Sequence, residues 1–254
     1  MIRRWCILVL LLMLALPLRP GRGTAAELRV AAAADLQFAF TEVGEAFRRA
    51  TGHRVTFVFG STGLLYHQIV HGAPYDVFAA ADVDRIEQLR ARGLIVEGSQ
   101  QVYAQGRIGI AVSRGTVISV ERLEDLASPA VTRVAIANPE HAPYGVAAKE
   151  ALINAGLWER VRGKLVYGEN VRQVLQYVES GNIPAGIVPL SLARSSGIRF
   201  TLLDAKLHRP LVQALAVIRT TRQEAAARSF IAFVNGPSGR PILRRYGFLL
   251  PGEF

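Results

Sequence analysis

The feature that most constrains the fold is a regular alternation of short apolar runs with stretches of helical periodicity. The apolar runs at 28–33, 76–81 and 133–137 predict buried strands. Between such runs, stretches such as 38–50 and 145–154 carry apolar residues at helical spacing. Because a helix that connects two parallel strands covers one face of their sheet, the alternation predicts an α/β fold of largely parallel sheets flanked by helices.

The alternation falls into two units joined by a strand-like segment at 105–113. A later strand-like segment, LVQALAVI at 211–218, is predicted to return the chain to the first unit. Two units with two crossings predict two α/β lobes with a hinge and a cleft between them. We assign 27–108 with 213–254 to lobe 1 and 109–212 to lobe 2. Sheets of this kind bind ligands at the carboxyl ends of their strands, which here would face the cleft.

The N-terminus predicts export. Arg3 and Arg4 precede an apolar run at 7–18, which is shorter than the roughly 20 residues of a membrane-spanning helix. A basic start, a short apolar run and small residues at a cleavage site are typical of a signal peptide. We therefore predict a cleaved signal peptide at 1–26 and a periplasmic protein; an uncleaved anchor is the alternative. Cys6 lies before the apolar run, so no lipid anchor is expected.

Composition excludes several classes of function. Cleavage after residue 26 would remove the only cysteine, which leaves no thiolate for a zinc or iron–sulfur site. It would also remove four arginines and no acidic residue, which lowers the formal charge from +10 to +6 (10 − 4). The remaining basic residues are scattered rather than clustered, so no nucleic-acid partner is expected. A mildly basic protein favours the approach of anions.

Four predicted strand-to-helix turns carry small or neutral polar residues where a helix begins. A helix N-terminus presents unpaired N–H groups and a partial positive charge, and is therefore suited to an anion. Serine, threonine and tyrosine hydroxyls add neutral donors. No Lys or Arg lies in these turns, which favours a fully ionised anion held by dipoles; ordinary helix capping is the alternative for each turn. The turns are Ala34-Asp35, Gly60-Ser61-Thr62-Gly63, Pro143-Tyr144-Gly145 and Glu169-Asn170-Val171.

Five segments make the sequence recognisable. They read VAAAADLQFA (30–39), FGSTGLLYHQIVHGAPYDVFAAAD (59–82), AIANPEHAPYGVAAKEAL (135–152), GENVRQVLQYVESGNIPAGIV (168–188) and RRYGF (244–248). On these segments the chain resembles the periplasmic molybdate-binding proteins of ABC importers, over essentially the whole mature chain. The resemblance implies a type II periplasmic-binding-protein fold and capture of molybdate or tungstate in the interlobe cleft. It also implies delivery of the anion to a permease in the inner membrane, with no cofactor besides the ligand. We expect a monomer.

The resemblance also implies the contacts to the oxyanion. By position they fall on Asp35, Thr62 with Ser61 beside it, Tyr144, the backbone N–H of Val171, and a site near Pro189. Two of these positions depart from the family pattern. The first contact is often a serine, where this chain has Asp35, and the fifth is often a tyrosine, where Pro189 offers neither a hydroxyl nor an N–H.

The two departures raise separate questions. A carboxylate beside a dianion is repulsive, so we predict that Asp35 turns away to cap the 36–50 helix and offers only backbone N–H groups. Alternatively, Asp35 accepts a proton from a protonated oxyanion such as hydrogen phosphate. Another tetrahedral oxyanion, such as sulfate or phosphate, is the alternative ligand to molybdate. Ser191 is a candidate to replace the missing tyrosine hydroxyl; capping of the short helix that follows is the alternative role.

Other chemistry has weaker support. Ser61 is not in a G-x-S-x-G elbow, and no motif places a histidine and an acid beside it, so hydrolysis is an alternative that we do not favour and no enzyme is expected. His67 and His71 have the spacing of a helical metal pair but lack a neighbouring carboxylate. We expect packing or surface roles for them and no cation site. His141 is expected to shape the turn before Tyr144.

Overall fold

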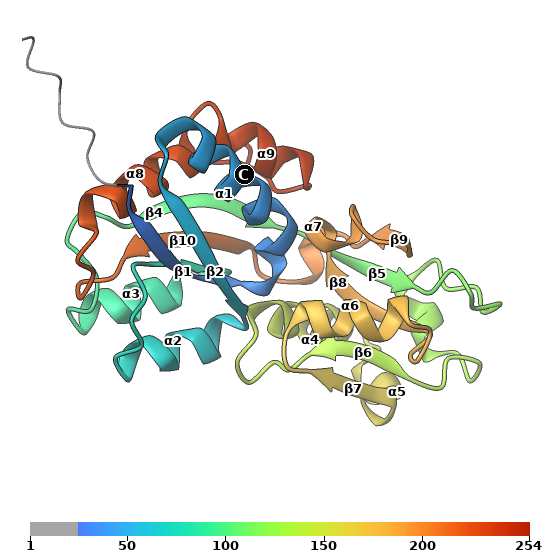
Figure 1. Ribbon diagram of the computed structural model, residues 1–254. Helices are drawn as coiled ribbons and strands as arrows, with labels where there is room; N and C mark the ends of the chain where they lie inside the picture. Colours follow the sequence, from blue (N-terminus) through green and yellow to red (C-terminus); the bar gives the residue numbers. More distant parts are fainter. Residues whose placement is uncertain (1–24) are drawn as a thin grey trace, which may run out of the picture.

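The computed structural model describes residues 25–254, and it forms two lobes that lie side by side (Figure 1). The predicted signal peptide lies outside the described residues except for Ala25 and Ala26. None of the helices within 25–254 is long and apolar enough to cross a membrane. Each lobe is built on a five-stranded sheet, so the predicted fold class of two α/β lobes is confirmed.

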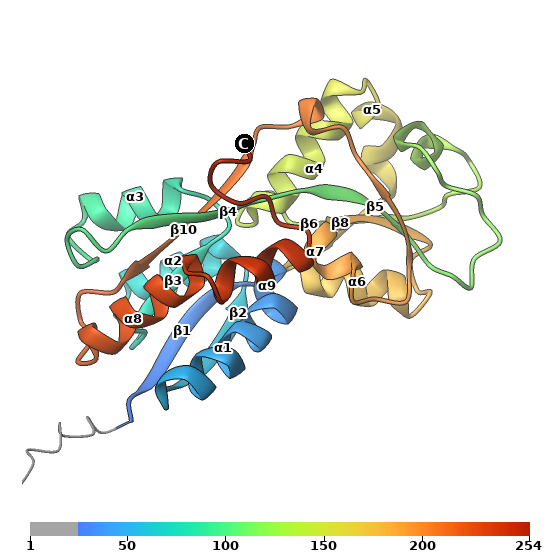
Figure 2. The same cartoon turned by 90° about the horizontal axis from the view of Figure 1, so that it is seen from above.

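The first sheet has the strand order β2-β1-β3-β10-β4. Its strands are β1 (Glu27–Ala33), β2 (Arg54–Gly60), β3 (Val77–Ala80), β4 (Gln101–Gly106) and β10 (Leu211–Val217). β1 is parallel to β2 and β3, whereas β10 runs antiparallel to β3 and β4. The helices of this lobe are α1 (Gln37–Thr51), α2 (Thr62–Val70), α3 (Asp84–Ala91), α8 (Glu224–Asn235) and α9 (Gly239–Arg245). In Figure 2, α1, α8 and α9 lie on one side of the sheet and α3 on the other.

The second sheet has the order β7-β6-β8-β5-β9. Its strands are β5 (Ile108–Val112), β6 (Val134–Ala137), β7 (Leu165–Gly168), β8 (Ala185–Pro189) and β9 (Arg199–Leu202). β6 is parallel to β7 and β8, and β5 is antiparallel to β8 and β9. Its helices are α4 (Pro143–Asn154), α5 (Trp158–Val161), α6 (Val171–Glu179) and α7 (Leu190–Ala193). Short 3-10 turns are η1 (Ala34–Leu36), η2 (Leu123–Ala127), η3 (Arg162–Lys164) and η4 (Ala205–Leu207).

The chain changes sheets twice. The single strand predicted at 105–113 is broken at Arg107, because β4 belongs to the first sheet and β5 to the second. The chain returns between β9 and β10. The Arg107 guanidinium donates to the Gly247 carbonyl at 2.9 and 3.2 Å, and Gln105 pairs with Leu249, so the C-terminal segment lies along the first crossing. The predicted lobe boundaries, 108/109 and 212/213, lie close to these crossings. They stay a prediction.

Buried apolar side chains hold both faces of the first sheet. On one face, Phe40, Phe47 and Phe230 pack with ring centroids 5.3 to 6.0 Å apart. On the other, Leu65 of α2 and Ile86 of α3 are buried against the sheet. Parallel strands end at one edge of their sheet, so β1 and β2 in one lobe, and β6 and β7 in the other, each deliver the helix that follows to the gap between the lobes.

Candidate functional site

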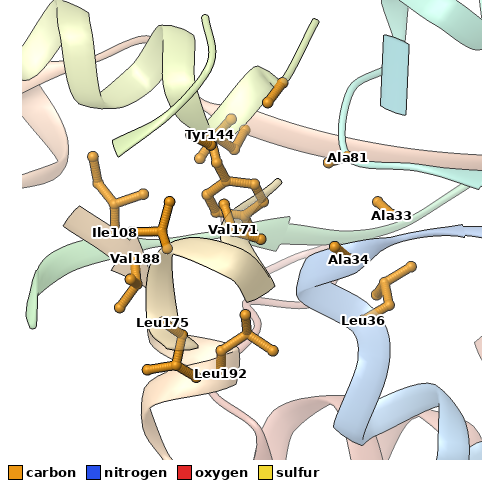
Figure 3. Close-up of a cluster of buried hydrophobic side chains, with 14 of the residues drawn as sticks. Ala33, Ala34, Leu36, Ala81, Ile108, Tyr144, Val171, Leu175, Val188 and Leu192 are labelled. Carbon is orange, nitrogen blue, oxygen red and sulfur yellow. The ribbon is translucent and has the colours of Figure 1, made fainter. Parts of the chain in front are cut away.

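A small cavity lies between the lobes where the four predicted turns meet. It is lined by residues 33–35 and 60–62 with Ala81 from the first lobe, and by residues 142–144 with Asn170 and Val171 from the second. Figure 3 shows Ala33, Ala34 and Ala81 opposite Tyr144 and Val171. Its volume of about 10 Å³ is far below the 300–1,000 Å³ of pockets for drug-sized ligands. The cavity therefore suits a small ion rather than a larger metabolite.

The backbone supplies donors on the second-lobe side. Asn170 caps α6, and its Oδ1 accepts from the N–H groups of Arg172 and Gln173 at 3.0 and 3.2 Å. The cap leaves the N–H of Val171, the first residue of α6, without that partner. Pro143 opens α4 and has no N–H, so Tyr144 carries the first N–H of that helix. Both helices direct the positive ends of their dipoles toward the cavity.

Thr62 supplies a hydroxyl on the first-lobe side. The residue is 1% exposed and is the first residue of α2. Its Oγ1 accepts a hydrogen bond from the Ala81 N–H at 3.0 Å. Since a hydroxyl that accepts a bond keeps its own proton, Thr62 can donate to a ligand in the cavity. No Lys or Arg lines the cavity, so the groups that mainly attract an anion are Thr62 and the helix N-termini.

Ser61 and Gly63 connect the lobes through His141. The Ser61 Oγ lies 2.8 Å from His141 Nδ1, and which atom donates depends on the ring tautomer. The Gly63 N–H donates to the His141 carbonyl at 2.8 Å. The start of α2 in the first lobe is thus bonded to the loop before α4 in the second. The sequence predicted a turn-shaping role for His141 and did not predict this interlobe contact.

Asp35 has its side chain between the lobes. The prediction that it caps the first helix is wrong, because residues 34–36 form the 3-10 turn η1 and α1 begins only at Gln37. Its Oδ2 instead accepts from the Tyr144 hydroxyl at 3.0 Å and from Gln213 Nε2 at 2.8 Å. Gln213 Oε1 accepts in turn from the Tyr103 hydroxyl at 2.7 Å. These four side chains form a buried polar network, which we call the Asp35 network.

Burial governs the ionisation of the Asp35 network. It raises the pKa of Asp35 from 3.8 to about 6, and the hydrogen bonds from Gln213 and Tyr144 oppose part of that rise. Burial, together with the nearby Asp35 carboxyl, holds the pKa of Tyr144 well above its usual value. Tyr144 therefore keeps its proton and donates it to Asp35, so this proton is already engaged within the protein.

Ser191 supports the site from outside the cavity. Its hydroxyl donates to the Asp35 carbonyl at 2.8 Å, and Ser191 is not among the residues that line the cavity. It does not cap α7, whose N-cap residue is Pro189 without a side-chain bond, so the capping alternative is wrong. Sequence reasoning also missed Gln213 and Tyr103. The isolated polar residue in the apolar run of β10 was the one signal that could have singled out Gln213.

The histidine pair formed by His67 of α2 and His71, which directly follows that helix, does not belong to this cavity. His71 Nδ1 lies 2.7 Å from the His67 carbonyl, and both residues line a separate surface depression. Within residues 25–254, no three His, Cys, Asp or Glu side chains are grouped so that they could hold a metal ion.

Two α/β lobes joined by strand crossings, with a small donor-lined cavity between them, define the class of two-lobed solute-binding proteins. The protein belongs to the bacterial extracellular solute-binding protein family, whose sequence model matches residues 28–249. The predicted membership of a solute-binding family is confirmed.

Individual relatives are similar over nearly their whole length. The chain is 33% identical over 251 residues to the molybdate-binding protein ModA of Rhodobacter capsulatus, covering 95% of this chain and 94% of the relative. It is 33% identical over 229 residues to ModA of Azotobacter vinelandii, covering 88% and 90%. The solved structure of the periplasmic molybdate-binding protein of Azotobacter vinelandii matches with a TM-score of 0.83 at 30% identity, covering 88% of this chain and 99% of that one.

A more distant structure shares the fold. The sulfate-binding protein SubI of Mycobacterium tuberculosis matches with a TM-score of 0.74 at 14% identity, covering 89% of this chain and 87% of that one. At that identity the likeness shows the fold alone.

Proposed function

We propose that this protein captures molybdate or tungstate in the interlobe cavity and delivers the anion to an ABC importer. The observation that carries the proposal is the cavity itself, where helix N-termini and hydroxyls converge and no Lys or Arg takes part. Neutral donors suit a tetrahedral oxyanion, because they can surround its oxygens without a salt bridge. The two relatives named as molybdate-binding proteins, each 33% identical, support this choice of anion.

The proposed contacts follow from the donors. Thr62 donates through its hydroxyl, and Val171 and Tyr144 through their backbone N–H groups. Ser61 contributes its hydroxyl when the ring of His141 donates to it, and Asp35 faces the anion through its carboxyl. Ser191 acts indirectly, through the Asp35 carbonyl.

Two other functions are weaker candidates. Sulfate or phosphate would fit the same kind of site, although the fold likeness to a sulfate-binding protein carries no evidence on the ligand. Hydrolysis through Ser61 has the 2.8 Å pair with His141 in its favour. A working pair needs a group that orients the histidine, and within residues 25–254 no side-chain hydrogen bond joins His141 to a carboxylate. We therefore propose a binding role without catalysis.

The setting of this function is the periplasm, after cleavage of residues 1–26. Lobe closure on the anion would present the surface that a membrane permease recognises, and a monomer suffices for that. The membership of an extracellular solute-binding family supports this location and this partner.

Calorimetric titration of residues 27–254 with molybdate, tungstate, sulfate and phosphate at neutral pH tests the function. We expect one anion per protein, with tight binding of molybdate and tungstate and little heat from the other two. If sulfate or phosphate binds and molybdate does not, the bound anion is the ligand instead of molybdate. Absence of binding by all four anions would reject an oxyanion function.

Replacement of Thr62 by valine tests the main side-chain donor. A hydrogen bond to an ionised group contributes about 1.5–3 kcal/mol, so Thr62→Val is expected to weaken molybdate binding by about 10- to 100-fold. Valine also leaves the Ala81 N–H without its acceptor, so the melting temperature is measured alongside. Thr62→Ser keeps a hydroxyl and is expected to bind within a few fold of the parent protein. A folded Thr62→Val protein with unchanged affinity would remove Thr62 from the site.

A further inference from the structure

One carboxyl oxygen sets Asp35 apart from the other polar side chains that line the cavity. Asp35 is 1% exposed and lines the cavity, and its Oδ2 accepts two hydrogen bonds from the Asp35 network. Its Oδ1 is buried as well, yet it has no hydrogen-bond partner among residues 25–254. A buried carboxylate oxygen without a donor is unfavourable. The missing interaction is one that a proton at Oδ1 would supply.

No group among residues 25–254 donates to Oδ1. The groups around the cavity that can bind an anion are N–H and hydroxyl donors, which are suited to oxygens that accept. A fully ionised oxyanion also only accepts, so the anion and an ionised Asp35 would repel each other in a space that no Lys or Arg lines. A proton between the two oxygens removes one negative charge and gives Oδ1 its partner.

We propose that the cavity binds its oxyanion together with one proton, which Asp35 Oδ1 and an oxygen of the anion share. The inference rests on the proposed function of oxyanion capture. When the anion arrives fully ionised, the proton comes from solvent, an O–H bond forms at the carboxyl, and the same proton returns to solvent on release. Binding of a dianion is thereby linked to the uptake of one proton.

The surroundings of Asp35 favour this arrangement. The Tyr144 hydroxyl from α4 and the neutral amide of Gln213 from β10 donate to its carboxyl, and the Tyr103 hydroxyl from β4 donates to Gln213. Burial already raises the pKa of Asp35 to about 6 without a ligand, and an adjacent dianion raises it further. Two other titratable groups lie nearby. They are His141, which is bonded to Ser61, and Asp82, which follows β3. Burial also raises the pKa of Asp82.

Proton counting by calorimetry tests the proposal. Molybdate is titrated into residues 27–254 at pH 7.5, 8.0 and 8.5, in two buffers with different ionisation enthalpies. We expect uptake of about one proton per anion and a dissociation constant that rises about tenfold per pH unit. In Asp35→Asn the side-chain amide donates without a proton from solvent. We expect almost no proton uptake, a pH-independent affinity, and binding at pH 8.5 at least about tenfold tighter than in the parent protein.

Asp82→Asn is the matched control, because it removes the other nearby carboxyl whose pKa burial raises and keeps an oxygen for the Arg85 N–H. It is expected to keep the uptake. Molybdate binding by the parent protein without proton uptake would overturn the proposal and leave the proposed function intact. Loss of the uptake in Asp82→Asn would also overturn it. Absence of any molybdate binding would reject the proposed function itself. The titration of the parent protein decides the proposal even if a variant fails to fold.

Discussion

Replacing Gly63 with alanine is expected to weaken molybdate binding by at least about 100-fold, or about 2.7 kcal/mol, with both lobes still folded. A Cβ at this position would lie 2.6 Å from the His141 carbonyl oxygen and 2.9 Å from the His141 Cα. Both atoms are backbone and cannot move aside cheaply. Because they belong to the other lobe, the clash is relieved when the lobes separate. Gly63 lies within α2, where alanine is well tolerated.

Calorimetry with molybdate measures this effect, and circular dichroism checks the fold. Gly163→Ala is the matched control, since its Cβ would meet nothing within 4 Å, and it is expected to bind as the parent protein does. Unchanged affinity in Gly63→Ala would mean that binding does not require the lobe contact seen here.

The ligand-free protein is expected to lose stability because of Asp35 as the pH rises from about 4 to about 6. In this window the unfolded chain releases the Asp35 proton near its ordinary pKa of 3.8, whereas the folded protein keeps it up to about 6. The unfolded state then binds fewer protons, so rising pH favours unfolding. The stabilisation that comes from the raised pKa of Asp35 is fully present below pH 3.8 and is lost as the pH rises from 3.8 through about 6. About two pKa units correspond to about 3 kcal/mol.

Asp35→Asn isolates this contribution, because asparagine has no proton to lose in that range. Other carboxyls act in the opposite direction, for example Asp125, whose pKa is lowered by backbone hydrogen bonds. The measured quantity is therefore the difference in free energy of unfolding between the variant and the parent protein, from urea titrations at pH 4 to 7. We expect this difference to grow in favour of the variant by up to about 3 kcal/mol. A constant difference would show that Asp35 does not titrate with a raised pKa.

Much of the fold could be predicted because it depends on local patterns. The predicted strand at 28–33 differs from β1 by one residue, and the predicted helix at 145–154 ends where α4 ends and begins two residues after it. The four turns were identified from residue types at helix starts, and they do meet at one cavity. Strand β9 and the break at Arg107 were missed, because both depend on which sheet the chain joins rather than on its local periodicity.

The orientation of the site side chains could not be predicted in the same way. Whether Asp35 caps α1 depends on the 3-10 turn η1, which delays the start of the helix and has no clear sequence signal. Its partners lie far away in the chain, Tyr144 at 109 residues and Gln213 at 178. The Tyr144 contact appears only once the two lobes are placed against each other, and the Gln213 contact only once β10 returns to the first sheet. The sequence therefore identified most of the residues that reach the cavity, with Ser191 as an exception, but not which of them bond to one another.

The equal division of the four helix starts between the lobes has a kinetic consequence for the proposed transport cycle. β1 and β2 supply two of them, and β6 and β7 supply the other two. An anion that meets one separated lobe finds only half of the donors, so loading onto that lobe is brief and reversible. The anion is retained once the donors of the second lobe also bind it. The lifetime of the complex is then set by the rate at which the lobes separate. A membrane partner that pulls the lobes apart would empty the cavity without touching the anion.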